Sequence, residues 1–193
     1  MKELEEKIIK EGRVYPGGVL KVDGFLNHRL DTRFIMRMGE YIAAKFADDA
    51  VTKVLTVEAS GIAMALAAAY RLDVPVVFAK KQKTSNMSAD VYSASVHSFT
   101  HNTDNTVIVS REYLEKDDRV LIVDDFLAEG NAMQGLLKIA DQAGCCVAGC
   151  CAAIEKGFQG GGDKLRAEGI KLLSLAIVDR MTDSEIVFRE NDG

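Results

Sequence analysis

The sequence predicts an α/β fold in which helices cover both faces of a doubly wound, mainly parallel sheet. Short apolar runs alternate along the chain with segments of helical spacing, as at 53–57, 62–71 and 120–123. The run at 120–123 has no polar alternation, which is typical of a strand buried on both faces. Two of these runs pass through a glycine-containing turn into a helix, so we expect a ligand at the carboxyl edge of the sheet.

Composition favours one soluble globular domain, because 193 residues with 48% hydrophobic and 27% charged side chains are ordinary values for that class. A net charge of −5 argues against general nucleic-acid binding, which requires a basic face. No apolar run reaches the roughly 18 residues that a membrane span needs, and the charged N-terminus does not resemble a signal peptide. We therefore expect a cytoplasmic protein.

The N-terminal part is predicted to hold two helices around an irregular segment. The first helix spans 2–11, and the second follows Asp31 or Thr32, either of which can cap it. Residues 19–31 have no clean period, so they form a loop or lie over another part of the protein. Apolar side chains at helical spacing predict the buried faces, with Leu4 and Ile8 on the first helix and Ile35, Met38, Ile42 and Phe46 on the second.

The strand at 53–57 runs into Glu58-Ala59-Ser60-Gly61 and then into an alanine-rich helix at 62–71. A glycine and a hydroxyl at a strand-to-helix turn suit an anion, because backbone N–H groups point out of the helix end. A third strand follows at 75–79.

Residues 80–92 are polar, basic at their start and without a hydrophobic period. A loop of this length inside a compact domain is usually functional, although a solvated basic run is the plainer alternative for Lys80 or Lys81. Residues 93–99 and 106–110, around a turn at 102–105, predict a β-hairpin beside the loop.

The stretch from 120 to 132 carries most of the functional signal. Asp124 and Asp125 follow the central strand, and residues 128–132 surround Gly130 before the next helix, where a phosphate can bind backbone N–H groups. Carboxylates placed against a phosphate would repel it, so the two acids must bind sugar hydroxyls or a bridging Mg²⁺. A ribose phosphate satisfies both demands.

A strand at 145–154 ends near Lys156, with a glycine-rich turn at 160–162 and final strands at 170–177 and 185–189. Lys156 donates hydrogen bonds and accepts none, so it suits an oxo group of a ligand and not an amino group. Phe158 could stack on a flat ring of that ligand. The remaining feature is four cysteines in two adjacent pairs, which we interpret as reduced, small side chains in a buried strand rather than a metal site: Cys145, Cys146, Cys150 and Cys151.

Position by position, residues 120–132 resemble the 5-phosphoribosyl 1-diphosphate (PRPP) motif of type I phosphoribosyltransferases, with four hydrophobic residues, two acids and a small-residue loop. No lysine follows the glycine, so the stretch is not a P-loop. The order of the 58–61 loop, the basic loop, the acid pair and Lys156 extends the resemblance to the whole chain. The whole chain resembles the type I purine phosphoribosyltransferases. The segments 20–28, 125–128 and 154–156, together with the length of the chain, narrow the resemblance to members that use xanthine.

This resemblance implies the type I phosphoribosyltransferase fold in a single domain, 1–193. It implies a flexible catalytic loop with its β-hairpin, and a small hood over the base that 1–34 and the C-terminal segment supply. It also implies a homodimer, and Mg²⁺ bound with PRPP. The implied site residues are Asp124 and Asp125 for catalysis; Ala128, Glu129, Gly130, Asn131, Ala132, Ala59, Ser60, Gly61, Lys80 and Lys81 for PRPP; and Leu20, Asn27, Lys156 and Phe158 for the base.

The implied reaction is transfer of the phosphoribosyl group to xanthine, giving xanthosine 5′-monophosphate and pyrophosphate, in purine salvage. An Asn27 amide could donate to the 2-oxo group that distinguishes xanthine from hypoxanthine. Guanine or hypoxanthine remains an alternative base, because Lys156 does not discriminate among oxopurines. A PRPP-sensing regulator is the alternative from another class, and it would need a DNA-binding module for which an acidic chain leaves little room.

Overall fold

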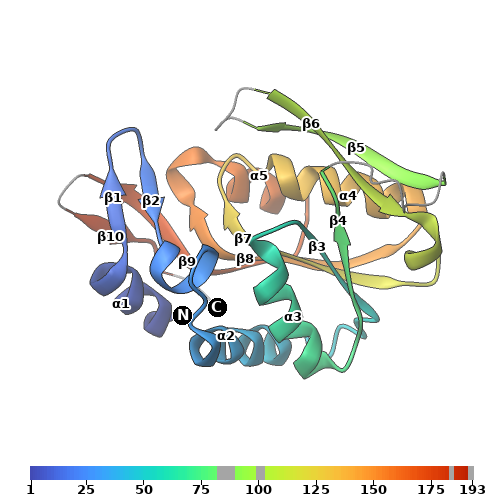
Figure 1. The fold of residues 1–193 in the computed structure, drawn as a ribbon, viewed down its shortest axis with the longest axis horizontal. Coiled ribbons are helices and arrows are strands. Elements are labelled where there is room, and N and C mark those ends of the chain that lie inside the picture. The colour runs from blue at the N-terminus through green and yellow to red at the C-terminus, as the bar shows by residue number, and fades with distance from the viewer. Residues whose placement is uncertain (82–89, 99–102, 183–184, 191–193) are drawn as a thin grey trace.

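A six-stranded sheet organises the computed structural model, which describes residues 1–81, 90–98, 103–182 and 185–190. The strand order is β10-β9-β8-β7-β3-β4 (Figure 1). All neighbours are parallel except β10, which runs antiparallel to β9 at one edge. The strands are β3 Lys53–Val57, β4 Val76–Ala79, β7 Arg119–Leu127, β8 Cys146–Lys156, β9 Leu172–Met181 and β10 Ile186–Phe188.

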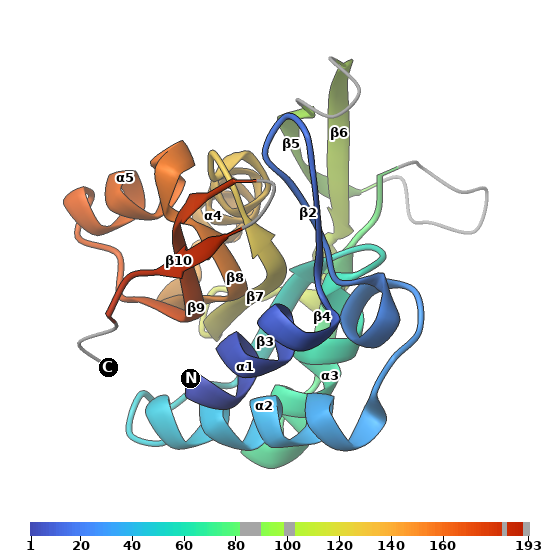
Figure 2. The same ribbon diagram turned by 90° about the vertical axis from the view of Figure 1, so that its left-hand side faces the viewer.

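Helices cover both faces of this sheet, as the sequence predicts. One face carries α1, α2 and α3, and the other carries α4 and α5 together with the β5–β6 hairpin (Figures 1 and 2). The helices are α1 Lys2–Glu11, α2 Thr32–Lys45, α3 Gly61–Leu72, α4 Asn131–Ala143 and α5 Gly161–Ala167. None of the described helices is long and apolar enough to cross a membrane.

The side chains of β7 explain why a strand without polar alternation sits at the centre. Leu121 and Val123 pack into the core under α1, α2 and α3, while Val120 and Ile122 pack into the core under α4 and the hairpin. Every one of the four is fully buried. Both faces of the strand therefore lie against apolar layers, as in parallel sheets generally.

The irregular segment after α1 lies over the rest of the protein rather than forming a free loop. It folds as a short hairpin, β1 Arg13–Tyr15 and β2 Val19–Lys21, followed by a π-helical turn, η1 Asp23–Asn27. The hairpin stands at the same end of the sheet as β10 (Figure 1). Asp31 caps α2 by accepting a hydrogen bond from the Phe34 N–H, as predicted.

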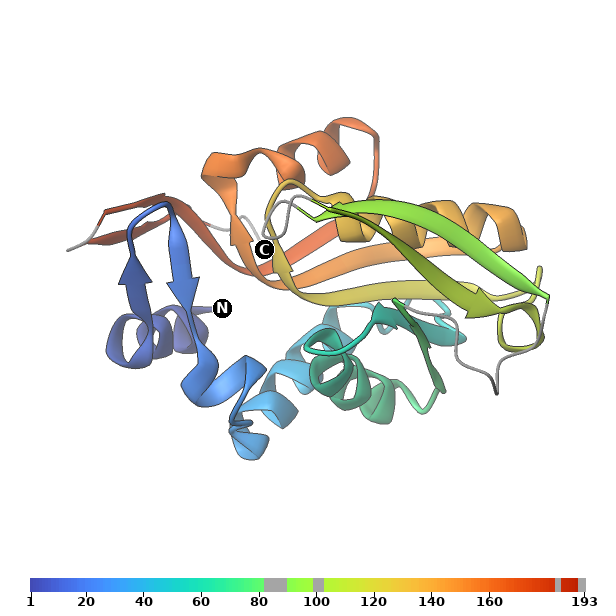
Figure 3. The same ribbon diagram turned by 45° about the horizontal axis from the view of Figure 1, so that its top comes forward.

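The hairpin after the basic loop forms, but its predicted turn is wrong. Strand β5 Val91–Ser98 pairs with β6 Thr103–Ser110 so that Ser98 lies opposite Thr103. Residues 103–105, assigned to the turn from sequence, therefore belong to the second strand, because strand pairing overrides their turn-forming composition. Most of the predicted catalytic loop, 82–89, lies outside the described residues. The hairpin covers α4 (Figure 3). Gln142 of α4 donates to the Ser93 carbonyl and accepts from the Ser93 N–H.

Two further sequence predictions need correction. Gly161 and Gly162 open helix α5, after a 3₁₀ turn at η3 Gly157–Gln159, instead of forming a turn. The four cysteines are free, but only Cys150 and Cys151 are buried in β8. Cys145 precedes the strand and is partly exposed, and Cys146 is exposed at the first position of the strand.

Candidate functional site

A cavity of about 340 Å³ opens where β3 and β7 lie side by side and their following turns separate. The chain goes from β3 outward to β4 on one side and reaches β7 on the other, so this is the point where the strand order reverses. Ligands of open α/β sheets bind at such a point, outside the carboxyl ends of the strands. The cavity wall includes Glu58, Ser60, Lys81, Asp124 and Asp125.

The two acids lie at the floor of this cavity and are nearly inaccessible to solvent. Asp124 is 5% exposed and Asp125 is 6% exposed. They belong to the last part of β7, which continues to Leu127 and does not end at Val123. The Asp125 N–H donates to Asp124 Oδ1 over 2.9 Å. Burial, and after it the charge of Asp125, raises the pKa of Asp124 well above its ordinary range, while Lys81 opposes the rise.

The loop after β7 presents backbone N–H groups to the same cavity, and all five residues from Ala128 to Ala132 line it. Gly130 caps α4 with a φ of 88°, a left-handed conformation that favours glycine. The first hydrogen bond of the helix runs from the Gln134 N–H to the Gly130 carbonyl over 2.9 Å. The N–H groups before Gln134 therefore point out of the helix end, where an anion can accept from them.

Gly161 allows this loop to lie close to α5. A Cβ atom on Gly161 would meet the Ala128 carbonyl oxygen at 2.3 Å and the Gly130 nitrogen at 2.6 Å. The Gly161 N–H donates to the same Ala128 carbonyl over 3.2 Å. The glycine-rich stretch thus packs against the loop 128–132, a role that its sequence did not reveal.

The loop after β3 forms the opposite wall, and Glu58 and Ser60 line it. The Glu58–Ala59 peptide bond is cis. Glu58 Oε1 accepts a hydrogen bond from the Lys81 N–H over 2.7 Å, which joins this loop to the start of the basic loop. Gly61 packs tightly, since a Cβ there would lie 2.4 Å from Thr56 Oγ1 and 2.9 Å from Asp124 Oδ1.

The two lysines of the basic loop separate, because consecutive residues of an extended chain point to opposite sides. Lys81 lines the cavity with the acids. Lys80 exchanges backbone hydrogen bonds with Ile108 and lines a different hollow of about 550 Å³, next to Phe78 and Tyr113. The role of Lys80 in binding a diphosphate stays a prediction.

Lys156 reaches the cavity from the end of β8, as its position in the sequence predicts. Its ammonium group donates to the Gly18 carbonyl over 3.0 Å and lies 5.8 Å from the centre of the Phe126 ring. Burial lowers the pKa of Lys156. The aromatic ring that lines the cavity is Phe126, whereas Phe158 is 44% exposed beside Gly18. Stacking of Phe158 on a base stays a prediction.

Asn27 links the N-terminal segment to the acids. Its amide nitrogen donates to Asp125 Oδ2 over 2.6 Å, although the two residues lie 98 positions apart. Its amide oxygen is buried and has no hydrogen-bond partner within the described chain. Leu20, the other N-terminal residue predicted to touch a base, is 5% exposed and packs in the core under α1, α2 and α3.

Sequence reasoning misses several residues of the site, among them Phe126, Gln159, Thr56 and Gly161. Phe126 and Gln159 line the cavity, and Thr56 is fully buried with an Oγ1 that has no partner among the described residues. The hydroxyl inside the otherwise apolar run at 54–57 is the one signal that could have identified Thr56.

Across residues 1–81, 90–98, 103–182 and 185–190, no three His, Cys, Asp or Glu side chains converge to hold a metal ion. Mg²⁺ prefers one or two carboxylates together with substrate phosphates and water, so two neighbouring acids fit a metal ion that arrives with a diphosphate.

Comparison with known proteins places this geometry in a family. Residues 29–167 match the family model of the phosphoribosyl transferase domain. The chain is 48% identical over 193 residues to a xanthine phosphoribosyltransferase of Limosilactobacillus fermentum, covering 100% of this chain and 99% of the relative. It is 53% identical to a xanthine phosphoribosyltransferase of Bifidobacterium longum subsp. infantis, covering 98% of this chain and 100% of the relative.

Solved structures resemble the fold at lower sequence identity. Adenine phosphoribosyltransferase from Rhodothermus marinus matches with a TM-score of 0.74 and 22% identity, over 92% of this chain and 100% of that one. The enzyme from Giardia lamblia complexed with 9-deazaadenine matches with a TM-score of 0.76 and 19% identity, over 92% and 98% of the two chains. These similarities show the fold and do not indicate which base this chain uses.

Proposed function

The chain belongs to the phosphoribosyl transferase family, and from this premise we propose that it transfers the 5-phosphoribosyl group of PRPP to xanthine. The products are xanthosine 5′-monophosphate and pyrophosphate. The observation that carries the proposal is one cavity shared by the acid pair Asp124–Asp125, the loop 128–132 and Lys156. The full-length similarity to proteins named xanthine phosphoribosyltransferase supports the choice of base.

PRPP binds through its two ends and its sugar. The 5′-phosphate accepts from the N–H groups of the 128–132 loop at the start of α4, where positive backbone charge is concentrated. The ribose hydroxyls donate to Asp124 and Asp125 on the cavity floor. These contacts fix the sugar relative to the base, and such positioning is the first requirement for reaction at C1′.

The pyrophosphate lies at the opposite wall, where Ser60 and Lys81 line the cavity and Lys81 offers a positive charge. We assign the backbone N–H groups of Ala59, Ser60 and Gly61 to its oxygens. Lys80 completes the set from its own or a neighbouring subunit. Mg²⁺ bound with PRPP supplies further positive charge to the leaving diphosphate. Among the described residues no three His, Cys, Asp or Glu side chains converge, so the acid pair would share that ion with the diphosphate.

The base occupies the side of the cavity near Lys156 and Phe126. The Lys156 ammonium donates to the 6-oxo group and Asn27 contacts the 2-oxo group, while Leu20 and Phe158 belong to the surround of the base. We assign the hood to 1–34 and the C-terminal segment of a single domain, 1–193. The contact from Lys156 to Gly18 supports this, because it joins the hairpin turn to the end of β8.

At the reacting carbon, the departing pyrophosphate leaves positive charge on the sugar. Asp124 and Asp125 stabilise that charge, since buried carboxylates act strongly in a site that excludes water. Closure of the basic loop keeps water from C1′.

A homodimer in the cytoplasm is the setting that we propose. Leu66 and Tyr70, one helical turn apart on α3, are 61% and 69% exposed and offer apolar surface to a partner subunit. Four free cysteines suit a reducing compartment.

The test is a competition among xanthine, guanine, hypoxanthine and adenine with PRPP and Mg²⁺, following nucleotide formation for each. Preference for xanthine of more than about tenfold in kcat/KM, or ~1.4 kcal/mol, is the expected result. Preference for guanine or hypoxanthine would leave the roles of Asp124 and Asp125 unchanged and would contradict the assignment of xanthine as the base. Binding of PRPP without turnover of any base would favour a PRPP-sensing regulator.

A further inference from the structure

The contact between Asn27 and Asp125 joins two sites that the proposed function treats separately. Asn27 belongs to the base surround, and Asp125 belongs to the ribose site. The amide N–H to Oδ2 distance of 2.6 Å is that of a strong, charge-assisted hydrogen bond. The opposite amide orientation would place oxygen against carboxylate oxygen, so the nitrogen must face Asp125.

The amide leaves two groups for a ligand. Its nitrogen has a second N–H, and its oxygen is buried without a partner in the described residues. An unpaired buried acceptor is unfavourable, so a ligand that donates to it gains that energy. Xanthine presents a carbonyl at position 2 beside a ring N–H, and this edge matches the free N–H and the free oxygen of one amide.

The segment that carries Asn27 is fixed by packing and hydrogen bonds, so the Asn27 side chain has a defined position. Phe25 and Leu26 of η1 are fully buried in the core. The Asp31 N–H donates to the Phe25 carbonyl over 3.0 Å, and Lys7 lies 5.3 Å from the centre of the Phe25 ring.

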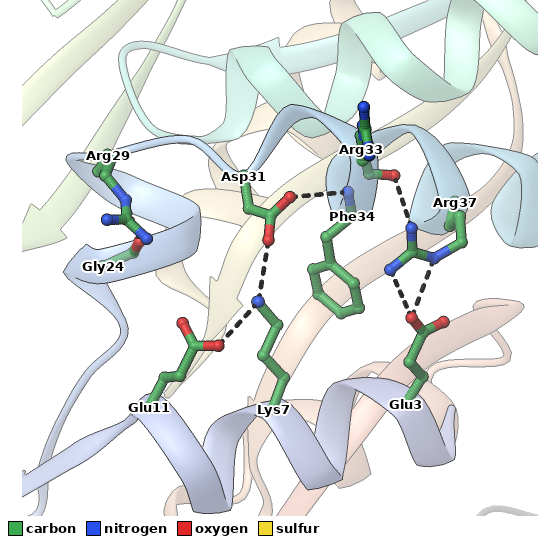
Figure 4. Close-up of polar contacts among 9 residues, drawn as sticks. All are labelled: Glu3, Lys7, Glu11, Gly24, Arg29, Asp31, Arg33, Phe34 and Arg37. Atoms are coloured by element: carbon green, nitrogen blue, oxygen red, sulfur yellow. Dashed lines mark hydrogen bonds and ion pairs between the residues drawn. The ribbon is translucent and has the colours of Figure 1, made fainter.

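Lys7 connects α1 to the start of α2 behind this segment. Its ammonium group bonds Asp31 Oδ2 over 2.9 Å and Glu11 Oε1 over 3.0 Å, and Figure 4 shows it between these two carboxylates. Asp31 at the same time caps α2 at Phe34. Helices α1 and α2 therefore hold η1 in place, so Asn27 lies on a fixed turn and not on a free loop.

We propose that Asn27 is a positioning residue for Asp125, and that its amide couples recognition of the 2-oxo group to the orientation of the ribose-binding carboxylate. The second half deepens the proposed function and depends on it. The first half concerns PRPP alone and can be tested without any base. Asn27 holds Oδ2 of Asp125, so the other carboxylate oxygen keeps one direction toward the sugar.

The first experiment measures binding of PRPP with Mg²⁺, without a base, by calorimetry. We expect Asn27→Ala to weaken binding about tenfold, the size of one lost hydrogen bond to a charged group. Asn27→Asp keeps the shape and places a second carboxylate against Asp125, so its loss should be larger. Asp23→Ala, an exposed position at the other end of the same turn, should change affinity less than about twofold.

A double-substitution cycle separates positioning from a general disturbance. In an Asp125→Ala background, Asn27→Ala should add less than about a twofold further loss, because the group that it orients is gone. Circular dichroism and thermal melting of each variant check that the fold is retained. A PRPP affinity for Asn27→Ala within twofold of the unmodified protein would overturn the positioning role, and so would equal losses in both backgrounds.

The coupling is read from kcat with xanthine and with hypoxanthine. In the unmodified protein, absence of the 2-oxo group should lower kcat as well as raise KM, and in Asn27→Ala the difference in kcat should disappear. If it persists, the coupling is overturned while the base assignment stands. If the unmodified protein binds PRPP but converts no base, the proposed function and the coupling fall together, and the PRPP measurements alone decide the positioning role.

Discussion

Two neighbouring strands end in buried carboxylates, and among the described residues only one of the two ends has a cation paired with its carboxylate. Glu155 at the end of β8 is fully buried and both of its oxygens are paired. Arg166 donates to Oε1 over 2.9 Å and to Oε2 over 2.7 Å, and the Ser174 hydroxyl also donates to Oε2. By contrast, no Lys or Arg of the described residues forms an ion pair with Asp124 or Asp125 at the end of β7.

The difference separates a carboxylate that stabilises the structure, Glu155, from the acid pair that we propose for function. A paired, buried carboxylate holds its neighbours in place, and Glu155 directly precedes Lys156. Gly162 makes room for it, since a Cβ there would lie 2.0 Å from Glu155 Oε1. The acids on β7 have no cation paired with them in the described chain, and burial, followed by the charge of Asp125, raises the pKa of Asp124. In the proposed function their oxygens accept from the ribose hydroxyls.

Removing the cation from the paired cluster should have the largest effect on stability. Arg166→Met leaves Glu155 buried without compensation, so we expect a loss of about 3–5 kcal/mol in the free energy of unfolding. Denaturant titration measures it. Glu155→Met combined with Arg166→Met should recover most of the loss, because no charge is then buried. Equal losses for the single and double variants would show that packing, and not the ion pair, holds this strand end.

Removing an acid from the unpaired cluster should affect activity instead. Asp125→Ala is expected to lower kcat/KM about 10²–10³-fold, as for loss of one preorganised electrostatic group. The free energy of unfolding should change little, because the carboxylate that is removed is buried without a cation to pair with in the described part of the chain. Steady-state kinetics and a melt measure both, with Asp141→Ala, an exposed acid on α4, as the matched control. Full activity in Asp125→Ala would end the assignment of the pair.

The smallest effect concerns pH. The pKa of Asp124 in the fold lies above its ordinary value of 3.8. Between that value and the raised one, the folded state keeps a proton that the unfolded state releases, so stability falls as pH rises through this window. Asp124→Asn carries no charge, so it should melt about 2–4 °C above the unmodified protein near pH 7 for each ~1 kcal/mol gained. That margin should shrink toward pH 4 in melts across pH; a margin that grows on acidification would contradict the assignment.

Local patterns were sufficient for most of the fold. The strand at 120–123 and the stripe from Ile35 to Phe46 appear in the structure as β7 and the buried face of α2. The spacing of their apolar residues follows from backbone geometry, so both elements can be predicted without knowing what packs against them. Two features could not be predicted from local patterns. Pairing with β5 places residues 103–105 in a strand and not in a turn. Packing of Gly161 against Ala128 decides the helix at 161–167.

The sequence by itself determined the α/β architecture, the acid pair at the carboxyl edge of the sheet and the glycine-centred loop after it. These depend on residues close together in the chain, whose spacing fixes what they can do. Only the tertiary structure decided that Asn27 bonds Asp125, that Phe126 lines the cavity and that Arg166 neutralises Glu155. The reason is physical: such contacts join segments far apart in sequence, and no local periodicity encodes which side chains folding will bring within hydrogen-bond distance.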